Sequence, residues 1–184
     1  MNNFSIIDIG LLSKSLLNSS LLFFRDEGEK IREALIPEII NSSTRVVALD
    51  FKNVTVIDFS CSDEIIVTLQ ENNKWLNGKK IILTNLSESH KENIFSALEK
   101  KKLGIWIIEN GETLTLGKLP KHLLKILDIV HKKKAITARY LSNDLDEDIT
   151  SISVKLGKLF QKGMLQRDEN KTSEGMEYIY RALL

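Results

Sequence analysis

The chain has 184 residues, of which 42% are hydrophobic and 28% charged, so it is long enough to bury one core or two small ones. Its 26 basic and 25 acidic residues nearly cancel, and the net charge of +1 excludes a global field that would point to nucleic acid or to an acidic substrate. The single cysteine, Cys61, excludes an internal disulfide and a cysteine-rich zinc site, as expected of a protein from a reducing compartment.

The first half of the chain alternates strand-like and helix-like segments. Apolar runs predict strands at residues 4–9, 45–51, 79–84, 104–108 and 112–116, with Gly10 ending the first. Helices are expected from Asp26, with Pro37 limiting or kinking the far end, and from a serine cap at Ser87 or Ser89. Residues 11–24 suit either a helix or a strand. This order predicts an α/β layer, and no glycine-rich phosphate loop follows any of the strands.

The stretch from Val54 to Leu69 reads as a strand, a turn and a helix. Val54 to Ile57 is apolar and β-branched, Asp58 and two serines then interrupt, and a helix is expected from Asp63 onward. Ser60 and Ser62 are both predicted to cap this helix, because a serine oxygen accepts from the free N–H groups of a first turn.

The segment Gly117 to Pro120 is the predicted boundary between two domains, residues 1–117 and 118–184. After it the apolar spacing predicts a helix that buries Leu123, Ile126, Leu127 and Val130, and a short second helix capped by Thr137. A third helix begins near Asp148 and stops at Gly163. Two strands then follow at 164–167 and 177–183, with residues 169–175 as the tip of a hairpin.

These three helices and the hairpin resemble the winged helix-turn-helix module. The resemblance is carried by ITARYLSNDL, ITSISVKLGKLFQKGMLQRD and EYIYRAL over some sixty-five residues. In that family the third helix enters the major groove and the wing touches phosphates. The resemblance implies that the DNA-binding residues are Thr150, Ser151, Ser153, Lys155 and Lys158 on the helix, with Lys171 and Thr172 on the wing.

Local charge gives mixed support for DNA binding. Residues 119–184 hold 12 basic and 9 acidic residues, a net charge of +3, whereas the rest of the chain holds 14 and 16, a net charge of −2. Asp144, Asp146, Glu147 and Asp148 crowd the start of the third helix, where they suit the helix dipole but repel a phosphate backbone. The alternative is a winged helix that docks protein or dimerises.

The first half resembles the STAS-like group, relatives of the sulfate transporter and anti-sigma factor antagonist fold. FRDEGEKIREAL, VVALDFKNVTVIDFSCSDEII and KIILTN carry the resemblance. In anti-sigma factor antagonists a serine at the start of the helix is phosphorylated by a partner kinase, and Ser60 falls on that position when Asp58 is matched to the aspartate of the motif. The resemblance thus implies a phosphorylation or partner switch at Ser60, with Ser62 and Asp58 beside it. Plain helix capping is the alternative for both serines.

Little in the sequence supports an enzyme or a metal site. His90, His122 and His131 share no metal-ligand spacing, and no positioned histidine or lysine accompanies the acids near Asp58. Cys61 reads as a small, partly buried residue. No signal peptide or transmembrane helix is apparent, which predicts a cytoplasmic location.

Taken together, the sequence predicts an α/β fold, a STAS-like mixed sheet with helices, followed by a C-terminal winged helix-turn-helix domain. The expected function is transcriptional regulation without catalysis or a cofactor. The expected partners are double-stranded DNA and a protein such as a kinase-like ATPase or an anti-sigma-type protein. A homodimer is expected because one winged helix covers little DNA. The alternative is a protein-interaction adaptor whose winged helix docks protein rather than DNA.

Overall fold

A computed structural model describes residues 4–173 and 175–184. The chain divides into two compact units, residues 1–118 and 119–184, and the division falls one residue beyond the boundary expected from the sequence. Both units contain helices and strands, and the larger sheet is mixed, so the α/β class is confirmed at that level. Within the described residues, no helix combines the length and the apolar character that crossing a membrane requires.

The first unit is built on a sheet of five strands in the order β1-β3-β5-β6-β7. Four of these strands run parallel, and the fifth pairs antiparallel at one edge. A second, smaller sheet pairs two short strands in parallel. The bounds of the large sheet's strands are β1 (Phe4–Asp8), β3 (Val46–Asp50), β5 (Lys80–Thr84), β6 (Gly104–Glu109) and β7 (Glu112–Gly117), and those of the small sheet are β2 (Leu21–Leu22) and β4 (Val56–Ile57).

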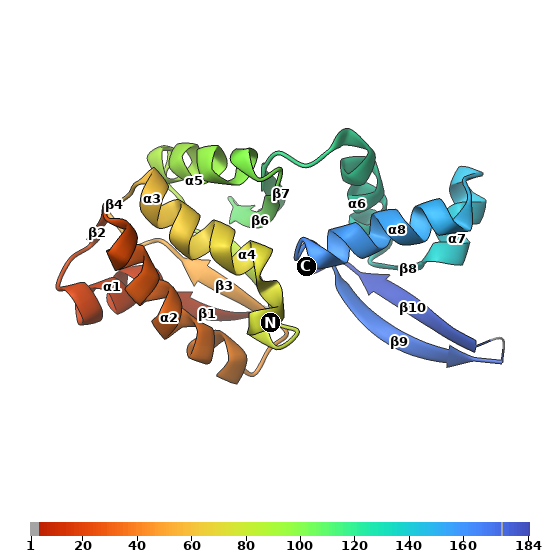
Figure 1. The fold of residues 1–184 in the computed structure, drawn as a ribbon, viewed down its shortest axis with the longest axis horizontal. Coiled ribbons are helices and arrows are strands. Elements are labelled where there is room, and N and C mark those ends of the chain that lie inside the picture. Colours follow the sequence, from red (N-terminus) through yellow and green to blue (C-terminus); the bar gives the residue numbers. More distant parts are fainter. Residues whose placement is uncertain (1–3, 174) are drawn as a thin grey trace. The chain divides into compact units, whose positions relative to one another are not determined.

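Helices connect the parallel strands, and several of them pass in front of the sheet in Figure 1. Their bounds are α1 (Ile9–Leu17), α2 (Arg25–Asn41), α3 (Phe59–Ser62), the π-helical segment η1 (Asp63–Val67), α4 (Thr68–Glu71), the 3₁₀ segment η2 (Asn73–Leu76) and α5 (Glu88–Lys100). Alternate strand residues such as Leu49 and Leu83 pack with Leu35, Ile65 and Leu98 of these helices into one apolar core. Because successive side chains of a strand point to opposite faces of the sheet, every second residue packs against these helices.

Some expectations for the first unit are wrong in detail. Gly10 does not end the first strand; it lies in the first turn of α1, which follows β1 directly. The ambiguous residues 11–24 contain both a helix and a short strand, α1 and β2. Pro37 does not end α2, which continues to Asn41. Ser87 caps α5 as one of the two predicted candidates, since its Oγ accepts from the N–H of His90 at 3.2 Å.

The second unit consists of three helices and a three-stranded antiparallel sheet in the order β8-β10-β9. The predicted apolar face of its first helix is buried, and Thr137 caps the second helix as expected. The hairpin is longer than predicted, because residues 169–172 belong to a strand rather than to the tip. The bounds are α6 (Lys121–Lys133), β8 (Ala135–Thr137), α7 (Ala138–Leu145), α8 (Ile149–Gln161), β9 (Gln166–Thr172) and β10 (Gly175–Arg181).

The first turn of α5 holds a buried histidine whose Nδ1 is a hydrogen-bond acceptor. His90 is 2% exposed, and its Nδ1 accepts from the N–H of Ser87 at 3.2 Å, so the ring proton lies on Nε2. Burial lowers the pKa of His90, while the backbone of Thr55 opposes this shift. A second proton on the ring would have to displace the Ser87 hydrogen bond.

Acid is therefore expected to destabilise the first unit through His90. Because the folded-state pKa lies below the unfolded value of about 6.5, the unfolded chain binds more protons, and stability falls as the pH drops through that value. Between about pH 7 and pH 5, His90→Gln should flatten this loss, since glutamine keeps an acceptor for the cap but does not titrate. Urea unfolding followed by tryptophan fluorescence measures it, and an unchanged pH profile in His90→Gln would contradict the assignment.

Candidate functional site

Helix α8 presents a polar, solvent-exposed face and is fixed at its start by an aspartate. The carboxylate of Asp148 accepts from the N–H of Ser151 at 2.9 Å, which sets where the helix begins. The other side of the helix is anchored in the core through Ile152, Leu156 and Leu159. Of the five predicted helix residues, four are exposed to solvent, namely Thr150, Ser151, Ser153 and Lys158.

Lys155 differs from the other four because an ion pair holds it against the unit. Its ammonium bonds the carboxylate of Glu147, and its side chain is 21% exposed. The same contact lowers the pKa of Glu147, so this carboxylate stays ionised and paired. Two of the four acids before α8 therefore have local roles, since Glu147 is neutralised and Asp148 caps the helix. The ion pair with Lys155 reduces the repulsion between Glu147 and a phosphate backbone, whereas Asp148 keeps its charge.

The hairpin of β9 and β10 carries the two predicted wing residues near its tip. Lys171 and Thr172 are exposed at the end of β9, and the Thr172 hydroxyl donates to the carbonyl of Gly175 at 3.0 Å. At the base of the hairpin, the guanidinium of Arg167 lies 4.3 Å from the ring centroid of Phe160 in α8 and 4.0 Å from that of Tyr178 in β10. These two cation–π contacts tie the hairpin to the helix and fix its direction.

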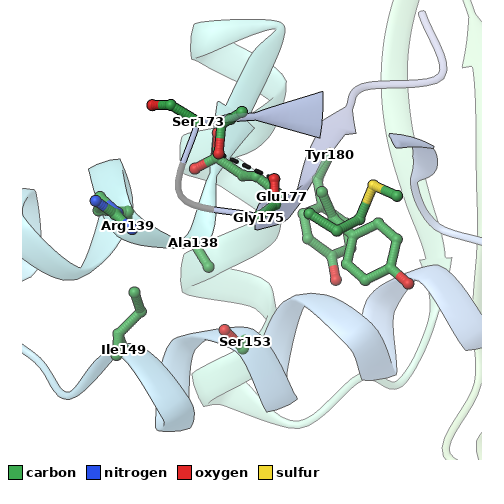
Figure 2. Close-up of a pocket in the computed structure, with 11 residues that line it drawn as sticks. Ala138, Arg139, Ile149, Ser153, Ser173, Gly175, Glu177 and Tyr180 are labelled. Atoms are coloured by element: carbon green, nitrogen blue, oxygen red, sulfur yellow. Dashed lines mark hydrogen bonds between the residues drawn. The ribbon is translucent and has the colours of Figure 1, made fainter. Parts of the chain in front are cut away.

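A groove of about 460 Å³ lies between the start of α7, helix α8 and the hairpin. Figure 2 shows Ile149 and Ser153 on α8, with the hairpin residues Ser173 and Glu177 across from them. Met176 and Tyr178 also line the groove, and Met176 is 54% exposed. These apolar lining residues were not predicted from the sequence, because their positions on the hairpin depend on where its strands begin and end.

The predicted switch residues lie where β4 leads into α3. Asp58, and not a serine, caps this helix: its Oδ1 accepts from the N–H of Cys61 at 2.8 Å. Ser60 is half-buried within the first turn. Ser62 is fully buried, and its Oγ donates to the carbonyl of Asp58 at 2.7 Å. The prediction that the two serines cap the helix is therefore wrong, because the backbone becomes helical one residue after Asp58 and both serines are already inside it.

Arginines of α2 neutralise the acids that follow Ser60. Arg25 bonds Asp63 at 2.8 Å and Glu64 at 2.6 Å, and Arg32 also bonds Glu64. Both acids lie in the π-helical segment η1, and such bulges are frequent at functional sites. The negative charges of Asp63 and Glu64 are therefore largely compensated, and Asp58 is the acid nearest in sequence to Ser60 that has no such ion pair among the described residues.

Cys61 has no features of a reactive thiol. It is buried, and its Sγ donates to the carbonyl of Phe24 at 3.0 Å. Burial, reinforced by the nearby carboxylate of Asp58, raises its pKa to about 12, so the thiol stays protonated. Over residues 4–173 and 175–184, no group of three or more His, Cys, Asp or Glu side chains is arranged to hold a metal ion.

Comparison with known proteins adds no relative. A scan against protein-family models, a search of curated proteins and a search of solved structures each returned no match.

Proposed function

We propose that this protein is a cytoplasmic transcriptional regulator in which a winged helix-turn-helix unit binds double-stranded DNA. The observation that carries the proposal is the exposed face of α8, with Thr150, Ser151 and Lys158, beside a hairpin that ends in Lys171 and Thr172. In winged helix-turn-helix proteins such a helix enters the major groove and such a hairpin reaches the phosphates. Hydroxyls and ammonium groups are suitable donors to phosphate oxygens and base edges.

Duplex binding by the full chain tests this proposal. Lys158→Ala and Lys171→Ala should each weaken binding to a random-sequence duplex of about 24 base pairs and each reduce the slope of log K against log salt by about 0.9, because one ammonium group no longer neutralises a phosphate. Lys132→Ala is the matched control, since Lys132 is already paired with Asp128 on α6. Fluorescence anisotropy at several salt concentrations measures the slopes. Equal slopes in all four proteins would mean that α8 and the hairpin are not the contact surface.

The first unit is proposed to act as a STAS-like switch that controls DNA binding through a protein partner, such as a kinase-like ATPase or an anti-sigma-type protein. Support comes from the burial of the two serines: Ser60 is half-buried in the first turn of α3, whereas Ser62 is fully buried, so Ser60 is the more accessible serine of the pair. A phosphate there would add a charge of about −1.5 to −2 beside Asp58. The arginines that would offset it already bind Asp63 and Glu64.

Pull-downs on substituted forms test the switch. Ser60→Asp should lose or exchange a partner that Ser60→Ala retains, because the added charge repels an acidic or apolar docking surface. Ser60→Asn is the matched control, since it has the shape of aspartate without the charge. Mass spectrometry of protein purified from its own host should find phosphate on Ser60. An unmodified Ser60 together with identical partners in all three forms would contradict the switch.

A protein-interaction adaptor is the second candidate, and the groove is the observation that favours it. Ile149, Met176 and Tyr178 are exposed apolar residues around one concavity, which suits a protein partner better than a phosphate backbone. This candidate predicts no duplex binding at low salt. A homodimer is proposed only with the first candidate, because two-fold DNA sites favour paired domains, and light scattering measures it.

A further inference from the structure

The exposed face of α8 holds one apolar side chain at its centre. Val154 is 50% exposed, and it lies four residues after Thr150 and four before Lys158, so the three side chains form one row along the helix. A β-branched residue is a poor choice for an exposed helix position, and Val154 is not part of the buried core of its unit. The exposure of its two methyl groups indicates an apolar contact with a partner outside the unit.

The residues around Val154 indicate which kind of partner it contacts. From Ile149 to Gly157 the exposed helix residues have hydroxyl or aliphatic side chains, so Lys158, one turn after Val154, is the first exposed residue of α8 that has a side chain of the kind that binds guanine. No atom lies within 4 Å of the place where a Cβ on Gly157 would be, so the surface of the helix is uncrowded at this position. Lys158 and Lys171 supply charge complementary to a phosphate backbone. The apolar feature that DNA offers in its major groove is the C5-methyl group of thymine.

We infer that Val154 is a specificity-determining residue whose methyl groups contact a thymine methyl group in the major groove. The inference rests on the proposed function. On this inference α8 prefers A·T base pairs, which it recognises by shape and by apolar contact. Thr150 and Ser151 form hydrogen bonds with base edges or phosphates around that contact. The inference predicts that removing the thymine methyl group, with the base pairing unchanged, weakens binding.

The test compares two duplexes of the same mixed sequence, one with thymine and one with uracil at every thymine position. The full chain should bind the uracil duplex roughly fourfold more weakly for each thymine methyl group that Val154 would otherwise touch. Val154→Ser should bind both duplexes equally. Leu124→Ser is the matched control: Leu124 is also exposed and apolar but lies on α6, outside the exposed face of α8 and the groove, so this variant should keep the preference for thymine. A third duplex with 5-methylcytosine in place of cytosine should bind more tightly than its unmethylated form.

The results of this test distinguish a failure of the Val154 inference from a failure of the DNA-binding proposal on which it rests. Salt-dependent binding with equal affinity for the thymine and uracil duplexes would overturn the inference and leave the DNA-binding proposal intact. A thymine preference that persists in Val154→Ser would overturn the assignment to Val154. No binding of any duplex at low salt would overturn both, and would instead support the adaptor.

Discussion

Replacing Gly10 with alanine is expected to destabilise the first unit by about 1–3 kcal/mol, the usual cost of forcing extra volume into a packed site. A Cβ on Gly10 would lie 2.3 Å from the backbone carbonyl carbon of Asn53, so backbone and not a flexible side chain would have to move. This contact holds the first turn of α1 against the loop after β3, where Asn53 Nδ2 also donates to Asp8 at 2.6 Å. The better helix propensity of alanine recovers about 1 kcal/mol at most.

Urea unfolding followed by tryptophan fluorescence measures this loss, because both tryptophans, Trp75 and Trp106, belong to the first unit. Gly157→Ala is the matched control in α8, where the space around the added Cβ is open. It should stabilise the second unit by about 0.5–1 kcal/mol, seen by far-ultraviolet circular dichroism, and leave the tryptophan transition unchanged. A Gly10→Ala protein as stable as the parent would contradict the close packing of α1.

Placing a carboxylate on α8 is expected to abolish most of the proposed DNA binding without harming the fold. Ser151 is exposed in the first turn of α8, where glutamate is favoured by the helix dipole. Facing phosphates or base edges, the same charge is repelled at a cost of several kcal/mol, so Ser151→Glu should bind a duplex roughly 100-fold more weakly at about 50 mM salt. Fluorescence anisotropy measures the affinity, and circular dichroism checks that the helix content is unchanged.

Ser151→Gln provides the comparison of equal size. It lacks the charge and should stay within a few-fold of the parent. If both variants bind DNA as tightly as the parent, α8 does not face the duplex. If both lose binding equally, the cause is the added volume and not the charge, and the electrostatic reasoning for this face fails.

The sequence predicted best where one local rule decides the outcome. Thr137 has no competing acceptor before α7, and Leu123 and Val130 lie on one helical stripe, so their roles follow from spacing alone. The cap of α3 could not be decided in this way, because Asp58, Ser60 and Ser62 are all suitable acceptors. Which one caps depends on where the backbone leaves the extended conformation, and β4 fixes that point by pairing with β2.

Only part of the candidate site was predicted from the sequence, because some of its residues are held by contacts with other segments of the chain. The resemblance to the winged helix-turn-helix module named Thr150, Ser151, Ser153 and Lys158 as outward residues, and all four are exposed on α8, while their role in DNA binding stays a prediction. Lys155 was expected to face outward with them, but Glu147, in the loop before the helix, holds it in an ion pair. That contact depends on the course of the loop after α7, which spacing along α8 does not determine. The neutralisation of Asp63 and Glu64 by Arg25 was missed similarly, because α2 lies nearly forty residues earlier in the chain.

The salt dependence of binding between the full chain and a random-sequence duplex decides whether α8 and the hairpin contact DNA. If α8 and the hairpin bind DNA, the affinity should fall linearly in log K against log salt between about 50 and 200 mM, with a slope of about −0.9 for each phosphate contacted. Competition by an unlabelled duplex should reverse the signal. No detectable binding at about 50 mM salt, with a correctly folded protein, would contradict the DNA-binding account.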